Sequence, residues 1–243
     1  LTGEKIGDMA DDYYFPSAAI KVQATDKISL GLIYDQPFGA DAAYGTETQR
    51  FSETHPLNKI TEGTSEEVKT ENLTALLGYQ LNENWNIYAG PVWQTVEANI
   101  KLRGAAYKNT GYNIKLDTEE AYGWLAGFAY QIPEIALKAS VTYHAEIEHK
   151  MNASENFGSA AIPTNPLNPV ISTITSTNSE TKLTTPQSIN IDFQTGIMAN
   201  TVAFANVRWV DWSKFKVQPY QFGKLSQYLG QNNLVPNKPN GFN

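Results

Sequence analysis

Apolar and polar residues alternate with a period of two from residue 135 to residue 148, and this pattern constrains the fold more than any other feature of the chain. Every second residue from Ile135 to Ile147 is apolar or aromatic, and those between them are mostly polar or charged. Side chains alternate between the two faces of a β-strand, so the pattern predicts one strand with an apolar face and a polar face. At roughly 3.3 Å per residue it would be about 40 Å long, more than a typical strand of a soluble protein.

The same alternation recurs, less regularly, in seven other segments. They are residues 18–24, 28–44, 73–80, 92–102, 122–130, 189–194 and 203–209. The connections alternate in length. Short turns are expected at 25–27, 81–84, 132–134 and 199–201, and long loops at 45–65, 104–119, 151–179 and from 217 onward. Alternation of tight turns and long loops is typical of a membrane β-barrel with periplasmic turns and outer loops.

We therefore predict an all-β fold, an antiparallel transmembrane β-barrel of the bacterial outer membrane with about eight strands present, whose apolar faces meet lipid. Aromatic residues at the turn ends, Tyr79, Trp85, Tyr88 and Tyr130, fit an interfacial girdle. The alternative is a soluble β-sandwich or lipocalin-like barrel, with the apolar faces turned inward.

Composition excludes several classes of function. The net charge of −7 and the absence of a basic stripe argue against binding to nucleic acid. The chain has no Cys, and its three His lack the spacing of metal ligands, so we expect no metal site. We find no nucleophile elbow, phosphate loop or other catalytic motif, so we expect neither an enzyme nor a cofactor. The chain begins at Leu1 and its last residues read as a loop, so we interpret it as an internal piece of a longer protein.

Four segments in order along the chain resemble the FadL family of outer-membrane long-chain fatty acid transporters. They are residues 14–40, 72–85, 122–130 and 209–215. The resemblance implies a monomeric fourteen-stranded barrel plugged by an N-terminal hatch. Residues 1–243 would then form a partial barrel domain holding the second to the ninth strand, without the hatch, the first strand and the C-terminal strands.

The resemblance also implies a function: passive uptake of long-chain fatty acids or other hydrophobic compounds, with release sideways through the barrel wall. The expected partners are a hydrophobic small molecule and the lipid and lipopolysaccharide of the outer membrane. An aromatic-hydrocarbon channel of the same family, and a surface barrel acting as adhesin or phage receptor, remain as alternatives.

A break in the wall is expected where strand 28–44 contains Pro37, Phe38 and Gly39. Proline cannot donate to the ladder, and glycine invites a bulge. The resemblance implies that the wall kinks here to make a lateral opening; the alternative is a strand that simply ends in a loop.

Ligand-binding residues are expected in two places. The loop 151–179 is apolar with little charge, which is typical of a binding surface; its candidates are Phe157, Ile162, Leu167, Val170 and Ile171. On the inward faces of strands we expect Phe204, Arg208 and Trp212, and also Thr95, Glu97, Asn99 and Lys101. Arg208 and Arg103 could bind a carboxylate or serve in salt bridges. An inward Glu97 would repel a carboxylate and favour a neutral hydrocarbon.

Overall fold

The computed structural model describes most of the chain: residues 6–10, 12, 14–55, 58–107, 110–157, 176–215 and 219–223. Within these residues the chain is built of β-strands. They are β1 (Ala18–Gln23), β2 (Ile28–Asp35), β3 (Gly39–Ala43), β4 (Ser52–Thr54), β5 (Thr61–Gly63), β6 (Ser65–Gln80), β7 (Trp85–Leu102), β8 (Tyr112–Ile132), β9 (Leu137–His144), β10 (Ile147–Phe157), β11 (Ser176–Thr185), β12 (Ser188–Met198) and β13 (Thr201–Val210). Three 3-10 turns, η1 (Ala105–Tyr107), η2 (Pro133–Ile135) and η3 (Trp212–Lys214), lie in connections. No helix in the described part is long and apolar enough to cross a membrane.

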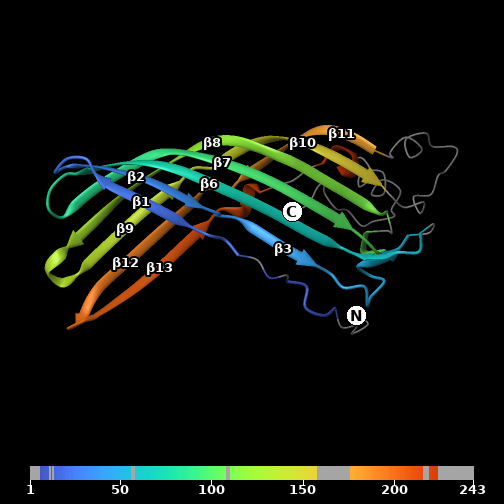
Figure 1. The fold of residues 1–243 in the computed structure, drawn as a ribbon, viewed down its shortest axis with the longest axis horizontal. Helices are drawn as coiled ribbons and strands as arrows, with labels where there is room; N and C mark the ends of the chain where they lie inside the picture. The colour runs from blue at the N-terminus through green and yellow to red at the C-terminus, as the bar shows by residue number, and fades with distance from the viewer. Residues whose placement is uncertain are drawn as a thin grey trace.

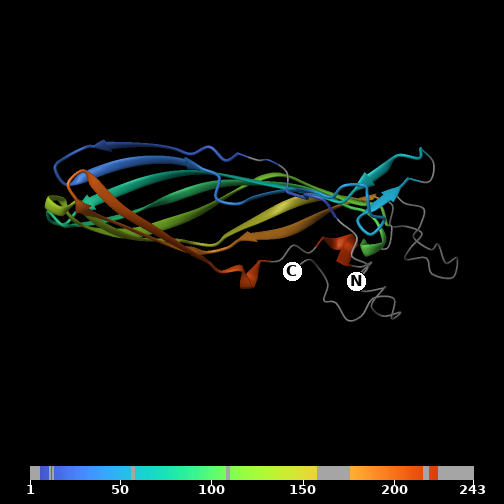
Figure 2. The ribbon, with the colours of Figure 1, turned by 90° about the horizontal axis from the view of Figure 1, so that it is seen from below.

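These strands form one curved antiparallel sheet in which neighbours in sequence are neighbours in space (Figure 1). Three positions in this meander each consist of two segments: β2 with β3, β9 with β10, and β11 with β12. The described strands therefore occupy eight positions, as the sequence predicts, with β4 and β5 forming a separate hairpin. The short turns gather at one end, and β4, β5 and the longer connections at the other (Figure 2).

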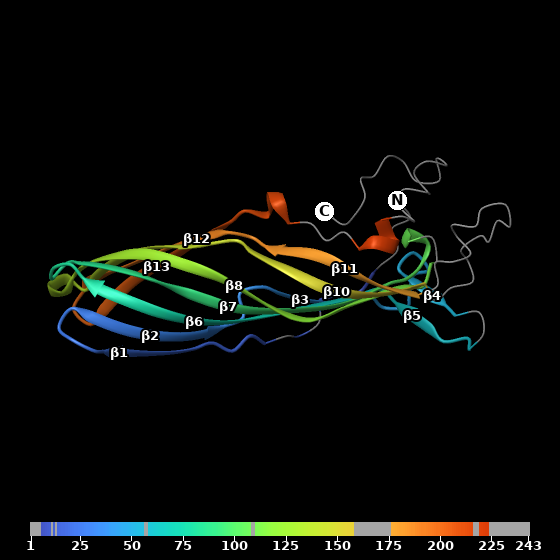
Figure 3. The same ribbon diagram turned by 90° about the horizontal axis from the view of Figure 1, so that it is seen from above.

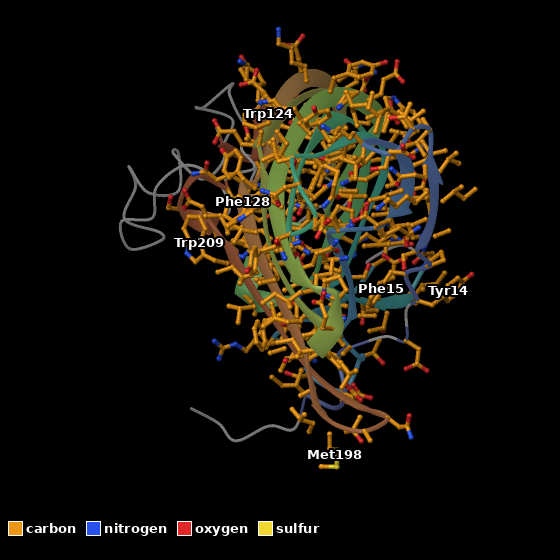
Figure 4. All side chains as sticks on the ribbon, turned by 90° about the vertical axis from the view of Figure 1, so that its left-hand side faces the viewer. Tyr14, Phe15, Trp124, Phe128, Met198 and Trp209 are labelled. Carbon is orange, nitrogen blue, oxygen red and sulfur yellow. The ribbon has the colours of Figure 1, made fainter. Side chains whose placement is uncertain are left out.

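The two faces of the sheet differ in burial. We call the face that carries the buried clusters the inner face, and the opposite one the outer face. Large apolar side chains are exposed on the outer face: Ile20, Val22, Leu30, Leu32, Leu73, Leu77, Tyr79, Trp85, Ile87, Tyr122, Trp124, Phe128, Ile191, Phe193, Val207 and Trp209. Viewed along the sheet, Trp124, Phe128 and Trp209 lie along one flank, with Tyr14 and Phe15 on the other (Figure 4). A continuous apolar surface of this kind is what lipid covers in a membrane barrel. We call it the outer belt.

The outer belt has a defined upper edge. Tyr34, Leu73, Trp93 and Tyr122 are paired in register across β2, β6, β7 and β8. Two residues further up, the outer face carries Glu71, Thr95 and Glu120 instead, and the Trp93 indole donates to the Glu120 carboxylate at 2.8 Å. From Trp85 to Trp93, eight steps of about 3.3 Å on a strand tilted by about 40° give a height of about 20 Å, close to the apolar band of outer-membrane barrels.

The sequence-based prediction was wrong for the upper half of β7. Thr95, Glu97, Asn99 and Lys101 lie on the outer face, and Glu97 accepts a hydrogen bond from Thr118 there. Their apolar neighbours point inward, and Val96 is 1% exposed. The reason is that the strand extends above the belt, where the outer face meets water and the apolar side chains pack inside. An inward Glu97 that repels carboxylates is thereby ruled out.

Other boundaries also differ from the prediction. β10 runs to Phe157 and β11 starts at Ser176, so the connection expected at 151–179 is shorter at both ends. The expected loop 104–119 is shorter, because β8 already begins at Tyr112. The expected strand 135–148 is interrupted after His144, and β10 starts at Ile147. The interruption shifts the alternation by one residue, so His144 lines an inner pocket and Ile147 and His149 are buried inside, whereas an uninterrupted strand would place the two histidines on opposite faces.

Candidate functional site

The link between β2 and β3 contains one residue more than the strand opposite it. Asp35 pairs with Asn72, and Gly39 pairs with Lys69. Residues 36–38 therefore face only residues 70–71, which is a bulge. Pro37 lies at its centre and has no N–H to give to the ladder. The strand expected at 28–44 is thus broken at the predicted residues, and we call 36–38 the kink (Figure 3).

The kink is displaced toward the inner face. The Phe38 N–H donates to Oγ1 of Thr70 at 2.9 Å, and the Thr70 hydroxyl donates to the Phe38 carbonyl at 2.5 Å. Thr70 is 3% exposed and points inward, so Phe38 is bound to a side chain above the sheet rather than to a backbone within it. On the outer face, Glu71 accepts hydrogen bonds from Tyr34 at 3.0 Å and from Gln36 at 3.5 Å. The ladder is therefore open between the kink and residues 70–71, at the upper edge of the outer belt.

The ring of Phe38 reaches the far side of the curved sheet. The guanidinium carbon of Arg208 lies 5.3 Å from its centroid, within the range of a cation–π contact. The indole of Trp212 meets it edge-on, with centroids 5.7 Å apart and planes at 74°. Arg208 lies on β13, paired with Asn190, and Trp212 begins η3 directly after that strand. The kink thus contacts the last strand of the sheet.

These contacts border a small pocket on the inner side of the sheet at the level of the kink. The pocket there has a volume of about 20 Å³ and is lined by residues of eight strands and three strand interruptions: Pro37, Phe38, Asn72, Val92, Gln94, Trp124, His144, Ala145, Ile147, Thr185, Pro186, Ser188 and Arg208. Such a volume has room for about one water molecule. We call this level the constriction.

A buried polar network borders the constriction. The Gln94 amide donates to Oδ1 of Asn72 at 2.8 Å, and its oxygen accepts from the Thr185 hydroxyl at 2.7 Å. Nε2 of His149 lies 2.9 Å from the same oxygen, which can only accept, so this nitrogen carries the hydrogen. All four residues are less than 9% exposed. The network ties the base of the β10–β11 hairpin to β6 and β7 across the inner face.

Above the constriction, apolar side chains of β7, β8, β10 and β11 form a closed cluster. Its buried members are Val96, Ala98, Leu102, Tyr112, Ile114, Leu116, Met151, Ala153, Phe157 and Leu183. We call it the upper chamber. The Phe222 ring stacks at a tilt on Tyr112, 5.0 Å between centroids.

One buried carboxylate holds the cover of the upper chamber in place. Glu155, 1% exposed, accepts from the Tyr112 hydroxyl at 3.0 Å and from the backbone N–H groups of Gln221 and Phe222 at 3.1 and 2.9 Å. The Ser179 hydroxyl donates to it at 3.2 Å. Because every hydrogen bond to the carboxylate is charge-assisted, the helical turn at 220–223 is firmly attached.

Arg103 joins the β4–β5 hairpin to the facing ends of β7 and β8 by hydrogen bonds. Its guanidinium donates to Glu62 at 2.8 and 3.0 Å, to the carbonyls of Leu102 and Tyr112, and to Asn113. The hydrogen bond from Arg103 lowers the pKa of the Glu62 carboxyl. With its side chain 7% exposed and its donors used, Arg103 has no capacity left for a ligand carboxylate.

The other predicted ligand residues have different positions. Phe157 ends β10 inside the upper chamber, with its ring 4.9 Å from that of Tyr112. Ile162, Leu167, Val170 and Ile171 lie outside the described residues. Phe204 and Arg208 share the inner face of β13, in register with Gln194 and Asn190, and Trp212 lies just beyond that strand in η3. Among the described residues, no cluster of three or more His, Asp or Glu could hold a metal ion.

Sequence reasoning missed Thr70, Gln94, His149 and Glu155. One signal was present for Gln94. One alternating series of β7 is apolar throughout and indicates the face that meets lipid: Trp85, Ile87, Ala89, Pro91 and Trp93. Gln94 belongs to the other series, which places it on the inner face. The roles of the other three depend on contacts between distant strands, which no local pattern predicts.

Curvature, sequential strand pairing, an apolar outer belt and buried clusters on the inner face together define a β-barrel membrane protein. Residues 2–233 match the family model of the outer membrane protein transport protein family (OMPP1/FadL/TodX). The chain therefore belongs to this family, whose members are outer-membrane proteins. None of the curated proteins compared with the chain matches it.

Solved structures share the fold at low sequence identity. A Pseudomonas aeruginosa FadL homologue is 14% identical with a TM-score of 0.64, over 84% of this chain and 51% of that one. The Ralstonia pickettii toluene transporter TbuX is 11% identical with a TM-score of 0.56, over 83% and 56%. The Pseudomonas putida toluene transporter TodX is 15% identical with a TM-score of 0.50, over 84% and 57%. The chain thus spans about half the length of these structures.

Proposed function

We propose that the protein of which this chain forms part takes up hydrophobic small molecules through the outer membrane by passive diffusion. Cargo enters through the upper chamber, passes the constriction and leaves sideways at the kink. The cargo then passes directly into the bilayer and does not cross a polar exit on the periplasmic side. The protein acts as a monomer in contact with the lipid and lipopolysaccharide around the outer belt.

The observation that carries this proposal is the bulge at the kink. A closed ladder offers no passage between strands, because every backbone group is bonded to its neighbour. Here three residues face two, and Phe38 bonds to a side chain instead of the backbone. The opening lies at the edge of the outer belt, where an apolar molecule can pass directly into lipid.

Long-chain fatty acids and neutral hydrocarbons both fit an apolar passage. The upper chamber is a packed cluster of aliphatic and aromatic side chains, among which either kind of cargo gains free energy by burying its apolar surface. The solved relatives TbuX and TodX are toluene transporters by name.

Deleting Pro37 tests the proposal, because two residues would then face two and the ladder could close. We expect the uptake of labelled toluene and of labelled oleate by cells with this variant to fall to that of cells without the protein. Heat-modifiable migration on a gel reports whether the variant is folded.

The matched control is deletion of Asn58, in the β4–β5 connection and away from the main sheet. It should leave uptake unchanged. Wild-type uptake by a folded Pro37-deletion variant would contradict lateral release at the kink.

A further inference from the structure

The helical turn at 220–223 lies against the upper chamber, at the end of the sheet that carries the longer connections (Figure 3). The ring of Phe222 stacks at a tilt on Tyr112, with centroids 5.0 Å apart. Tyr112 is completely buried, and on its other side the ring of Phe157 lies 4.9 Å away. Cargo that approaches from the outer loops therefore meets this turn before it reaches the apolar side chains beneath. We call the turn the cover.

The backbone of the cover is bonded to one side chain of β10. Oε1 of Glu155 accepts from the Gln221 N–H at 3.1 Å and from the Ser179 hydroxyl at 3.2 Å. Oε2 accepts from the Phe222 N–H at 2.9 Å and from the Tyr112 hydroxyl at 3.0 Å. The strands around the chamber are joined instead by ladders of many backbone hydrogen bonds. The cover thus depends on a single side chain far more than these strands do.

The chemistry of the donors makes this attachment reversible. Within the described part of the chain, the four groups that donate to Glu155 are two hydroxyls and two backbone N–H groups, all of them neutral. Separating a buried carboxylate from a cation would leave two uncompensated charges. When a backbone N–H leaves, a water molecule can donate to the same oxygen in its place. The cover can therefore open while Glu155 remains hydrogen-bonded.

We propose that the cover controls the entry of cargo into the upper chamber, and that Glu155 is the positioning residue that keeps it closed. The chamber opens when the N–H groups of Gln221 and Phe222 leave the carboxylate together, which moves the Phe222 ring off Tyr112. This inference rests on the proposed function, in which cargo enters through the upper chamber, and adds the step that admits it.

Glu155→Gln should release the cover with little change of side-chain shape. Whichever carboxylate oxygen becomes the amide nitrogen, that nitrogen donates and faces one N–H and one hydroxyl that also donate. We expect hydrogen exchange at Gln221 and Phe222 of the purified whole protein to accelerate by roughly 10- to 100-fold, the effect of losing a hydrogen bond to a charged group. The uptake of labelled toluene and labelled oleate by cells should rise, because the cover opens more often. A purely structural role of Glu155 predicts no gain.

The matched control for this variant is Glu148→Gln. It removes an exposed carboxylate of the same strand, which forms an ion pair with Lys182 at 3.0 Å. Hydrogen exchange of the cover and uptake of both compounds should stay as in wild type.

A clamp on the cover should have the opposite effect and leaves Glu155 in place. Ser179 and Gln221 both donate to Oε1 of Glu155, so their positions are close. Ser179→Cys and Gln221→Cys, joined by a reducible thiol-specific linker, should stop uptake, and reduction should restore it. The control clamp joins Ser154→Cys and Asn178→Cys, which are paired in register on the exposed side of the same hairpin, and should change nothing.

The outcomes separate this inference from the proposed function. If wild type takes up neither compound above cells without the protein, the proposed function fails and control by the cover fails with it. If wild type takes up both, only the cover's role is overturned by undiminished uptake with the cover clamped. A Glu155→Gln variant that frees the turn without any gain in uptake overturns it equally. Unchanged hydrogen exchange in that variant would show that Glu155 does not hold the cover.

Discussion

Single polar side chains on the inner face hold segments that are far apart in the chain. Thr70 binds both backbone groups of Phe38, and Glu155 binds two backbone N–H groups of the turn at 220–223. Each is almost fully buried, so its hydrogen bonds have no competition from water. In this way two irregular segments, the kink and the cover of the upper chamber, acquire fixed positions.

The Glu62–Arg103 pair makes the loop hairpin β4–β5 sensitive to acid. The hydrogen bond from Arg103 lowers the pKa of Glu62 below its ordinary 4.5 in the folded protein. The stability that the ionised Glu62–Arg103 pair gives the β4–β5 hairpin is therefore fully present above pH 4.5. It is lost as the pH falls through the lowered pKa of Glu62. Hydrogen exchange of residues 52–64 should lose protection at acid pH in wild type, while Glu62→Gln should show little protection at either pH. Glu148→Gln, which removes an exposed pair with Lys182, should behave as wild type; an acid-insensitive wild type would contradict the assignment.

Residue roles were predictable only where the chemistry is local. Pro37 and Gly39 mark the kink because proline lacks a donor and glycine tolerates a bulge. Phe204 and Arg208 follow from simple alternation along β13. For Arg103 the sequence left a carboxylate site and a salt bridge open, and its partner was not predictable, because Glu62 is 41 positions away and comes close only through the loop hairpin.

At the scale of elements, the β10–β11 hairpin leans over the inner face. β8 pairs with β9 up to Leu125↔His144 and with β10 again from Leu116↔Ala153. Between these points β10 lies over β8: a Cβ placed on Gly123 would be 2.6 Å from Cγ1 of Ile147. The absence of a side chain at Gly123 thus permits the close approach that brings His149 and Thr185 to Gln94.

Substituting Gly123 by Ala should destabilise the folded barrel by about 1–3 kcal/mol, the usual range for overpacking. Ile147→Ala in the same chain should recover part of this loss, because it removes the clashing atoms. Gly31→Ala is the control, since its Cβ would meet Leu76 at an ordinary 3.4 Å. Urea unfolding of refolded protein measures all of these variants. Strict additivity of Gly123→Ala and Ile147→Ala would contradict the contact.

The interruptions between elements were visible in the sequence only in part. Pro37 and Pro186 mark two of them, because neither residue can donate within a ladder. The third, at residues 145–146, carries no proline or glycine and lies within the most regular alternation of the chain. It arises from the lean of β10 into the interior, which shifts the apolar series from the outer face to the inner face.

At the scale of the whole molecule, the apolar series changes sides where the membrane ends. Within the outer belt, apolar residues face outward; above its edge, they face inward and form the upper chamber. The number and order of strands were predictable from alternation and turn spacing. The change of side was not, because period two is the same on both faces and only the surroundings decide which face is buried.

The most direct test of lateral release is a reversible clamp across the kink. Since the chain has no Cys, Gln36→Cys and Glu71→Cys can be joined on the outer face by a reducible thiol-specific linker. The control clamp joins Glu67→Cys and Asn99→Cys, which are paired in register at a continuous part of the wall. We predict that the clamp at the kink stops the uptake of toluene and oleate, that reduction restores it, and that the control clamp has no effect. Undiminished uptake through the clamped kink would contradict the account.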